Sequence, residues 1–187
     1  MSLHASDQKK MNAQVMDDLL LKIGQNDESA FRKLYEQMSS AVFAYALSVV
    51  KNRADAEDIM QDTFLKIRAA AHLYEADGKA KSWIFTIVRN LCMMHFRENR
   101  RQIDTPADEM TYMEDLSFIE DHETRLTVRS VLKELNDEES QIIILHAVSG
   151  MKHREIASIL NIPLATVLSK YHRGLKKLRK NLEGVIK

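Results

Sequence analysis

The sequence predicts an all-α protein of two small helical domains joined by an acidic, flexible linker. The chain has 187 residues but only two Pro and five Gly, and it is rich in residues that favour helices. No stretch alternates apolar and polar residues as a half-buried β-strand does. The hydrophobic fraction of 45% is sufficient for packed cores. A chain of this length can form one large domain or two small ones, and the charges favour two.

Charges are segregated along the chain, although the net charge is zero. Residues 1–100 are close to neutral, residues 101–122 contain one basic and seven acidic residues, and residues 123–187 contain twelve basic and seven acidic residues. A change of composition of this kind marks a linker. We therefore predict an N-terminal domain over 1–100, an extended and mobile linker over 101–122, and a C-terminal domain over 123–187.

Composition also argues against several classes of protein. Cys92 is the only cysteine, which excludes an internal disulfide, disfavours a Cys-ligated zinc site and fits a reducing cytoplasm. The start of the chain lacks an apolar segment of signal-peptide length, and no later run is long enough for membrane insertion. We find no acid–base pair, nucleophile constellation or Gly-rich phosphate loop. We therefore expect a cytoplasmic protein without enzymatic activity, cofactor or metal.

Four helices are predicted in the N-terminal domain. The first covers 11–23, and the second follows the capping residues 26–29. The third is capped by Asn52 and ends near Ala71. A loop containing Asp77-Gly78 then leads to the fourth, which begins near Trp83.

The third predicted helix has an acidic face. Asp55, Asp58 and Asp62 follow one another at helical spacing, and Leu65 projects beside them and beside Gln61. An apolar side chain held outside the core within an acidic patch suits a docking surface for a basic partner. A solvated acidic face with one exposed leucine explains the pattern equally well.

The fourth predicted helix and the loop before it combine basic, polar and aromatic side chains. Cations contact phosphates and flat side chains stack on bases, as binding to single-stranded or partly opened DNA requires. A solvated basic face with aromatic residues in the core is the alternative interpretation. The candidate DNA contacts are Lys79, Lys81, Ser82, Trp83, Arg89, Asn90 and Arg97.

The C-terminal domain is also predicted to contain four helices. The first spans 125–135, and Asn136 caps the second. The third begins at His153 and ends at the turn 161–163, where Pro is tolerated, and the fourth begins near Leu164. Two helices joined by so short a turn match the helix-turn-helix, whose second helix enters the major groove of DNA.

The last predicted helix has one apolar and one basic face. Lys and Arg on a terminal helix can simply solvate it, but the preceding helix and turn favour DNA binding. The face predicted to pack contains Leu164, Val167, Tyr171, Leu175, Leu178 and Leu182. The candidate DNA contacts on the other face are Thr166, Ser169, Lys170, Arg173, Lys176 and Lys177.

Taken together, these segments resemble bacterial sigma factors of the extracytoplasmic-function (ECF) group, in the sigma-70 family. The resemblance covers about 13–183 and is carried by three segments: DAEDIMQDTFLKI at 55–67, KSWIFTIVRN at 81–90, and the segment from LNDEES to GLKKLR at 135–179. It implies a dissociable, non-enzymatic subunit that binds the RNA polymerase core and directs promoter recognition, DNA melting and transcription initiation.

The resemblance also implies a partner for each segment. The helix at 55–67 docks on the clamp helices of the largest polymerase subunit, and the region 79–101 captures and melts the minus-ten promoter element. The helix-turn-helix at 153–180 reads the minus-thirty-five element as duplex. An anti-sigma factor is implied as an antagonist.

Three residues depart from the usual pattern of the family. Ala165 and Leu168 replace a usual Gly and Lys at the start of the recognition helix, and Met94 replaces a usual Asp. The missing Lys removes one contact to phosphate or base. The alternative function is that of a dimeric helix-turn-helix regulator, with 1–100 as a sensor or dimerisation domain, which binds a palindromic operator without polymerase.

Overall fold

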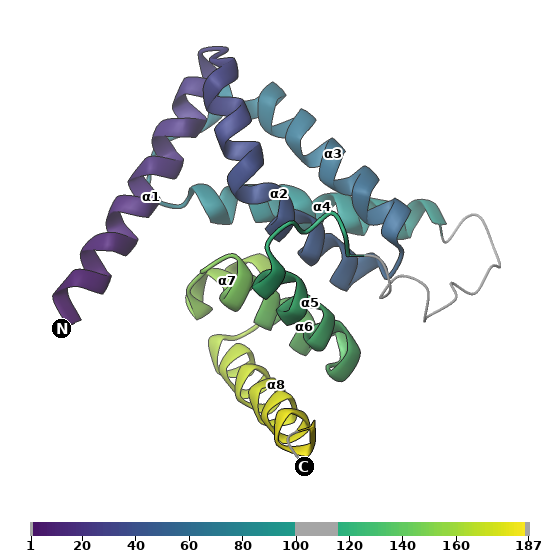
Figure 1. Ribbon diagram of the computed structural model, residues 1–187. Coiled ribbons are helices and arrows are strands. Elements are labelled where there is room, and N and C mark those ends of the chain that lie inside the picture. Colours follow the sequence, from purple (N-terminus) through teal and green to yellow (C-terminus); the bar gives the residue numbers. More distant parts are fainter. Residues whose placement is uncertain (1, 100–115, 186–187) are drawn as a thin grey trace.

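The structure, a computed structural model, describes residues 2–99 and 116–185 (Figure 1). Every regular element within these residues is a helix, which confirms the predicted all-α class. The N-terminal group contains α1 (Ser2–Gly24), α2 (Glu28–Val50), α3 (Arg53–Ala70), the 3-10 turn η1 (Ala71–Leu73) and α4 (Ala80–Asn99). The C-terminal group contains α5 (His122–Glu134), α6 (Asp137–Ile143), the π-helical turn η3 (Ile144–Val148), α7 (His153–Leu160) and α8 (Leu164–Val185).

Side-chain caps fix the start of several helices. Asp27 accepts hydrogen bonds from two backbone N–H groups at the start of α2, Asn52 accepts one from Asp55, and Asn136 accepts one from Glu139. These bonds satisfy donors that a helix leaves unpaired at its first turn. The helices capped by Asn52 and Asn136 begin where the sequence predicts, and α8 begins at Leu164 as expected.

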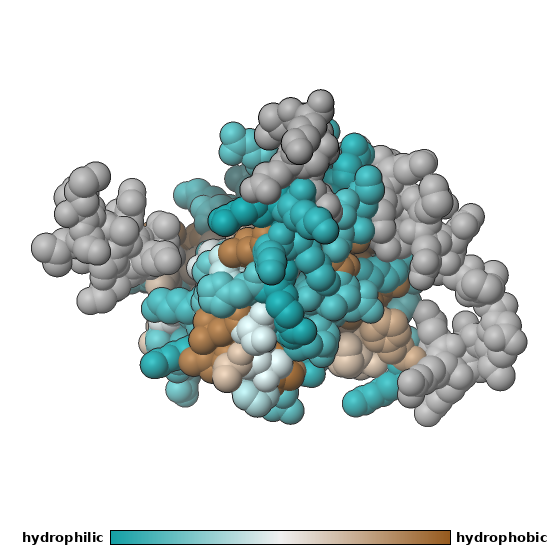
Figure 2. All heavy atoms as spheres, turned by 90° about the horizontal axis from the view of Figure 1, so that it is seen from below, coloured by the Kyte–Doolittle hydropathy of each residue, from teal (hydrophilic) through white to brown (hydrophobic). Residues whose placement is uncertain are grey.

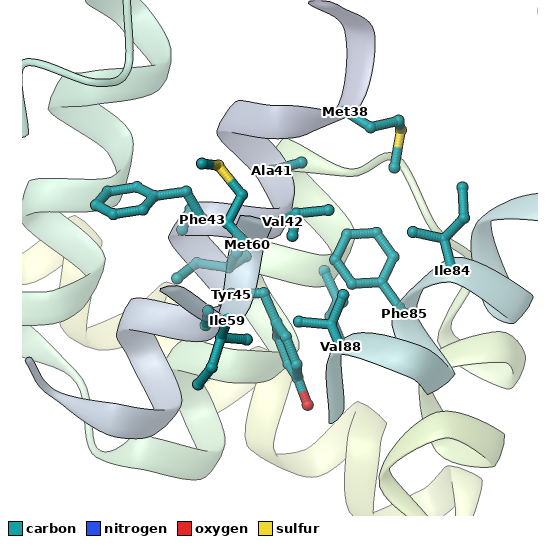
Figure 3. Packing of buried hydrophobic residues seen from close by; sticks show 14 of the residues in the cluster. Met38, Ala41, Val42, Phe43, Tyr45, Ile59, Met60, Ile84, Phe85 and Val88 are labelled. Carbon is teal, nitrogen blue, oxygen red and sulfur yellow. The ribbon is translucent and has the colours of Figure 1, made fainter. Parts of the chain in front are cut away.

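The C-terminal half of α2 is the centre of the core. Every residue from Ala41 to Val50 is buried, because α3 and α4 pack on it from one side and α6 and η3 of the C-terminal group pack on it as well. Figure 3 shows Tyr45 between Ile59 of α3 and Val88 of α4, while the Phe43 ring points away from the labelled side chains of α4. The ring of Tyr45 meets that of Phe85 edge-on, with 5.7 Å between centroids. A helix apolar on all sides is stable only when it is covered on all sides.

The predicted linker ends in an anchored stretch. Residues 101–115 lie outside the described residues. Leu116 and Ile119 are buried, and the ring of Phe118 lies 5.1 Å from that of Phe43 between centroids. Residues 116–121 therefore differ from the extended, mobile segment predicted, because their three apolar side chains gain more by packing than by remaining in water. Asp121 caps α5, which begins at His122 rather than at Arg125.

The two groups of helices also contact each other directly (Figure 1). The Lys81 ammonium at the start of α4 donates a hydrogen bond of 2.6 Å to the carbonyl oxygen of Ser149, which precedes α7. Lys51, at the end of α2, forms an ion pair of 3.2 Å with Asp137 at the start of α6. The N-terminal ends of α4 and α7 thus lie close to each other.

Candidate functional site

The acidic face of α3 is exposed as the sequence predicts. Asp58, Gln61, Asp62 and Leu65 lie on one side of the helix, and the Leu65 side chain is 64% exposed. The predicted packing residues Ala56, Met60, Phe64, Ile67 and Ala71 are all buried on the opposite side. The four exposed residues at positions i, i+3, i+4 and i+7 form a continuous stripe, which we call the α3 face.

Asp55 is placed differently from the rest of this set. Its side chain is half-buried, and one carboxylate oxygen lies 3.1 Å from Nε2 of His95 on α4. His95, predicted as a core histidine, is itself half-buried at the packed interface of α3 and α4. Asp55 therefore lies at the edge of the α3 face and faces α4.

The loop before α4 is ordered by polar contacts and one aromatic contact. Asp77 accepts a hydrogen bond from the backbone N–H of Lys79 and a second, of 2.6 Å, from its ammonium. The bond to the Lys79 side chain holds the pKa of Asp77 below its usual value. The half-buried ring of Trp83 packs at 5.3 Å from that of Tyr74, between centroids. An exposed basic residue and an aromatic ring thus lie at the two ends of the same turn.

The predicted minus-ten residues are not equally accessible. Lys79, Asn90 and Arg97 are exposed, whereas Ser82, Trp83 and Arg89 are half-buried. Lys81 lies in the contact between the two groups of helices, where burial lowers its pKa and its ammonium is bonded to the Ser149 carbonyl. The structure therefore brings the set to one end and one side of α4 but engages Lys81 within the protein.

Helix α8 follows the turn that the sequence predicts. Asn161 adopts a left-handed conformation at φ 55°, and the Ile162 N–H returns to the Ala157 carbonyl at 3.1 Å. α8 then packs closely on α6, because a side chain at Gly174 would come within 2.6 Å of the Ile143 Cδ1 atom. Gly174 faces α6, and the neighbouring Leu175 is 39% exposed. The predicted packing role of Leu175 is therefore wrong.

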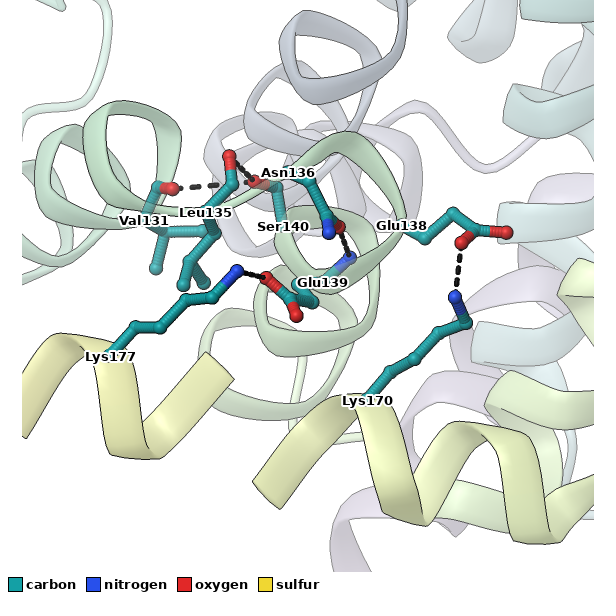
Figure 4. A network of polar contacts seen from close by, with 8 residues as sticks. All are labelled: Val131, Leu135, Asn136, Glu138, Glu139, Ser140, Lys170 and Lys177. Carbon is teal, nitrogen blue, oxygen red and sulfur yellow. Dashed lines mark hydrogen bonds and ion pairs between the residues drawn. The ribbon is translucent and has the colours of Figure 1, made fainter. Parts of the chain in front are cut away.

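The six candidate DNA contacts of α8 fall into two sets. Ser169, Arg173 and Lys176 are exposed and Thr166 is half-buried, at spacings that place the four on one stripe. Lys170 pairs with Glu138 and Lys177 pairs with Glu139 at 2.6 Å, so both ammonium groups turn to α6 (Figure 4).

The face of the molecule toward which α8 points is largely hydrophilic, with smaller apolar areas among the hydrophilic residues (Figure 2).

Glu139 explains why Lys177 faces inward. Its side chain is only 2% exposed, and a buried carboxylate is unfavourable unless a cation or hydrogen bond compensates it. Ser140 beside it donates hydrogen bonds to the carbonyls of Val131 and Leu135, so the start of α6 is polar but internally satisfied (Figure 4). Lys177 therefore supports the fold of the domain that carries α8.

We expect Lys177→Ala to destabilise the chain by on the order of 1–3 kcal/mol, since Glu139 then remains buried without its partner. The effect should stay below that of a fully buried pair, because the Lys177 side chain is 47% exposed. Lys176→Ala, one residue away on the exposed stripe, should change stability by no more than about 0.5 kcal/mol. Urea unfolding of the full chain measures both.

In DNA binding we expect the reverse order: Lys176→Ala should have the larger effect and Lys177→Ala the smaller. Lys176→Ala should lower the slope of log K against log salt by roughly one, whereas Lys177→Ala should leave that slope unchanged in folded protein. Equal unfolding midpoints for the two variants would contradict the assignment of Lys177 to the fold.

Among the side chains that the structure describes, no three or more His, Cys, Asp or Glu form a cluster that could bind a metal ion. None of the described helices is both long and apolar enough to span a bilayer.

Two family models match the chain in the order of its two groups of helices. Sigma-70 region 2 matches residues 34–102, and Sigma-70, region 4 matches residues 125–178. Among curated relatives, the ECF RNA polymerase sigma factor SigX of Bacillus subtilis is 25% identical over 165 residues, which cover 83% of this chain and 85% of that protein. The ECF RNA polymerase sigma factor SigK of Mycolicibacterium vanbaalenii is 29% identical over 179 residues, 89% of each chain.

Solved structures are similar in fold over most of the chain. CnrH, in complex with the cytosolic domain of CnrY, matches with a TM-score of 0.60 and 22% identity, over 91% of this chain and 98% of that one. The sigma factor RpoE, in complex with the anti-sigma factor NepR from Bartonella quintana, matches with a TM-score of 0.59 and 24% identity. The match covers 82% of this chain and 96% of RpoE.

Proposed function

The chain belongs to the ECF group of the sigma-70 family and is a sigma factor, and we propose that its two domains divide polymerase docking and promoter recognition between them. In this proposal the N-terminal domain, residues 1–100, binds the polymerase core and the minus-ten element. The C-terminal domain, residues 123–187, binds the minus-thirty-five element. Residues 101–122 connect them.

The observation that carries the docking role is the α3 face. Leu65 is 64% exposed among Asp58, Gln61 and Asp62, on a helix whose other side is buried in the core. An exposed apolar side chain next to charged and polar residues is a common composition of a protein interface. We assign this face to the clamp helices of the largest polymerase subunit, with Asp55 at its edge.

The loop before α4 and the exposed side of α4 are assigned to the minus-ten element. Lys79, Asn90 and Arg97 are free of the core and can reach phosphates or bases. Trp83 offers an aromatic surface for an unstacked base, with Ser82 and Arg89 beside it. Lys81 can join this set only after its bond to the Ser149 carbonyl has broken.

The exposed stripe of α8 is assigned to the minus-thirty-five element. Thr166 and Ser169 lie near the N-terminal end of the recognition helix, which is the part that contacts base edges in helix-turn-helix proteins. Arg173 and Lys176 lie farther along the same stripe and suit phosphate contacts. Lys170 and Lys177 contribute to DNA binding mainly through the domain, because both are paired with carboxylates of α6.

An anti-sigma factor is proposed as a further partner. Both solved structures of similar fold described above are complexes, one with the cytosolic domain of CnrY and one with an anti-sigma factor. A protein that holds these helices together would keep Lys81 from DNA. The alternative of a dimeric operator-binding regulator has no comparable observation in its favour.

Affinity capture tests the proposal. We expect a tagged full chain to retain bacterial core polymerase with one copy of the chain per enzyme, and to be monomeric by size-exclusion chromatography in its absence. The complex should transcribe from a duplex selected out of a random-sequence pool. A stable homodimer that binds a palindrome and retains no polymerase would overturn the proposal in favour of the operator-binding regulator.

A further inference from the structure

Asp17 of α1 ties together the two ends of the loop that precedes α4. Its side chain is only 6% exposed. One carboxylate oxygen accepts a hydrogen bond of 2.6 Å from the hydroxyl of Tyr74, and the other accepts one of 2.7 Å from the backbone N–H of Gly78. A single carboxylate thus fixes two points of the loop that are four residues apart.

We propose that Asp17 is a positioning residue for promoter melting, which holds the loop 74–79 and Trp83 in the arrangement that receives an unstacked base. This inference rests on the minus-ten role proposed above for the loop and α4. Asp17 touches no DNA in this proposal. It acts through Tyr74 and Gly78.

The loop depends on polar contacts for its shape. Residues 75–79 are all exposed, so apolar burial cannot fix them. Gly78 has a φ of +77°, and a Cβ atom placed on it would meet nothing within 4 Å. The space beside the Gly78 Cα atom is therefore open to a ligand, while its N–H is held by Asp17 and the next residue, Lys79, by Asp77.

The contact to Tyr74 extends this control to Trp83. Tyr74 is buried, and its ring packs against that of Trp83. Burial, together with the hydrogen bond to Asp17, raises the pKa of the Tyr74 hydroxyl, which therefore stays protonated and donates a hydrogen bond to the carboxylate. Hydrogen bonds to an ionised acceptor are about twice as strong as neutral ones. Asp17 of α1 therefore fixes the orientation of the Tyr74 ring, which packs against Trp83.

Holding the loop in advance matters because capturing a base has an entropic cost. Unstacking and unpairing a base requires a few kcal/mol, and ordering a flexible loop at the same moment adds to that requirement. A loop that is already ordered leaves more of its contact energy for the base. Loosening it should therefore reduce melting far more than binding to polymerase or to duplex.

The test uses Asp17→Asn in the full chain assembled with core polymerase. The amide keeps the size of the side chain but supplies one acceptor instead of two, so the Gly78 or Tyr74 donor loses its partner. Asp18→Asn is the matched control, because Asp18 is adjacent and exposed and the substitution changes charge identically. Tyr74→Phe removes only the hydroxyl contact. The template is a promoter selected from a random-sequence pool with the unmodified holoenzyme.

Permanganate reactivity of unpaired thymines is compared on linear duplex and on the same sequence with a premelted bubble. We expect Asp17→Asn to reduce open complexes on duplex by about tenfold or more, with Tyr74→Phe intermediate and Asp18→Asn unchanged. The bubble should restore most of the loss, and core affinity should stay within about twofold.

Trp83 provides a second readout, since it is the only tryptophan of the chain. Acrylamide should quench its fluorescence more strongly in Asp17→Asn and Tyr74→Phe, while the far-ultraviolet circular dichroism spectrum stays unchanged.

Different failures have different meanings. Normal melting of duplex by Asp17→Asn overturns the inference alone. An equal loss on duplex and bubble, with reduced core binding or a lower unfolding midpoint, overturns it also, because Asp17 would then serve only the fold. If the unmodified chain opens no promoter with core polymerase, the proposed function fails and this inference fails with it.

Discussion

Replacing both Asp58 and Asp62 with Lys should weaken binding of the chain to core polymerase by roughly a hundredfold. Opposed like charges at an interface cost several kcal/mol, and each 1.4 kcal/mol is a factor of ten in affinity. The fold should be unaffected, because both side chains are exposed and neither forms an ion pair within the described residues. Surface-plasmon resonance with immobilised core measures the loss.

The control for this experiment carries the same change in net charge elsewhere. Asp18 and Glu36 are exposed and belong to α1 and α2 rather than to the α3 face, so the double replacement Asp18→Lys and Glu36→Lys should bind core nearly as the parent does. Leu65→Ala should weaken binding without any change of charge, because it removes the exposed apolar contact of the α3 face. Unchanged core affinity of the Asp58 and Asp62 variant, with intact helicity, would remove the α3 face from the docking surface.

Trp83→Ala should reduce open-complex formation on duplex DNA by at least about tenfold, while core docking and binding to the minus-thirty-five element remain largely intact. Loss of the ring removes a stacking surface, which contributes roughly 1–3 kcal/mol per base in single-strand binding. A premelted bubble should restore much of the transcription, since unpairing is then complete in advance. Permanganate reactivity on both templates measures this.

Trp83 is a sharper test than Lys81, although both replacements by Ala are expected to impair melting. Lys81→Ala also removes the hydrogen bond to the Ser149 carbonyl and so alters the contact between the domains. Trp83→Phe serves as the control, because a smaller ring can still pack beside Tyr74. Normal melting by Trp83→Ala would place the base-capturing surface elsewhere in the N-terminal domain.

Local features of the structure could be predicted because they depend on neighbours in sequence. The cap at Asn52 and the periodicity of 56–71 together determine where α3 begins and which side is buried, and the exposed α3 face follows from the same periodicity. The turn before Leu164 could be found in the same way, since Pro and the break in periodicity are both visible in the sequence.

Features that depend on distant residues could not be obtained this way. Asp17 lies 57 residues from Tyr74, and in the sequence it is one polar residue on an ordinary amphipathic helix. The helical wheel of α8 placed Lys170 and Lys177 on the DNA side, but their carboxylate partners lie on α6, 32 and 38 residues away. A helical wheel gives the direction of a side chain around the helix axis. It does not show which partners a neighbouring helix places in that direction.

One signal of the contact between domains was present in the sequence. The run AVFAYALSVV at 41–50 is apolar around the whole circumference of a helix, whereas a helix at the edge of a small domain needs only one apolar side. Its outer side is covered by α6, η3 and the stretch that contains Phe118. The second signal was the presence of apolar residues 116, 118 and 119 within the acidic segment, because such residues favour packing over exposure to water.

In the proposed minus-ten role of Lys81, its bond to the Ser149 carbonyl couples the packing of the domains to promoter binding. In that role the half-buried ammonium must leave the Ser149 carbonyl to reach DNA, so the C-terminal domain would compete with the promoter for Lys81. The contribution of Lys81 to minus-ten binding is then reduced to the fraction of molecules in which the domains have separated. A substitution at the Lys51 and Asp137 ion pair, outside both proposed DNA surfaces, should therefore change promoter affinity through that population.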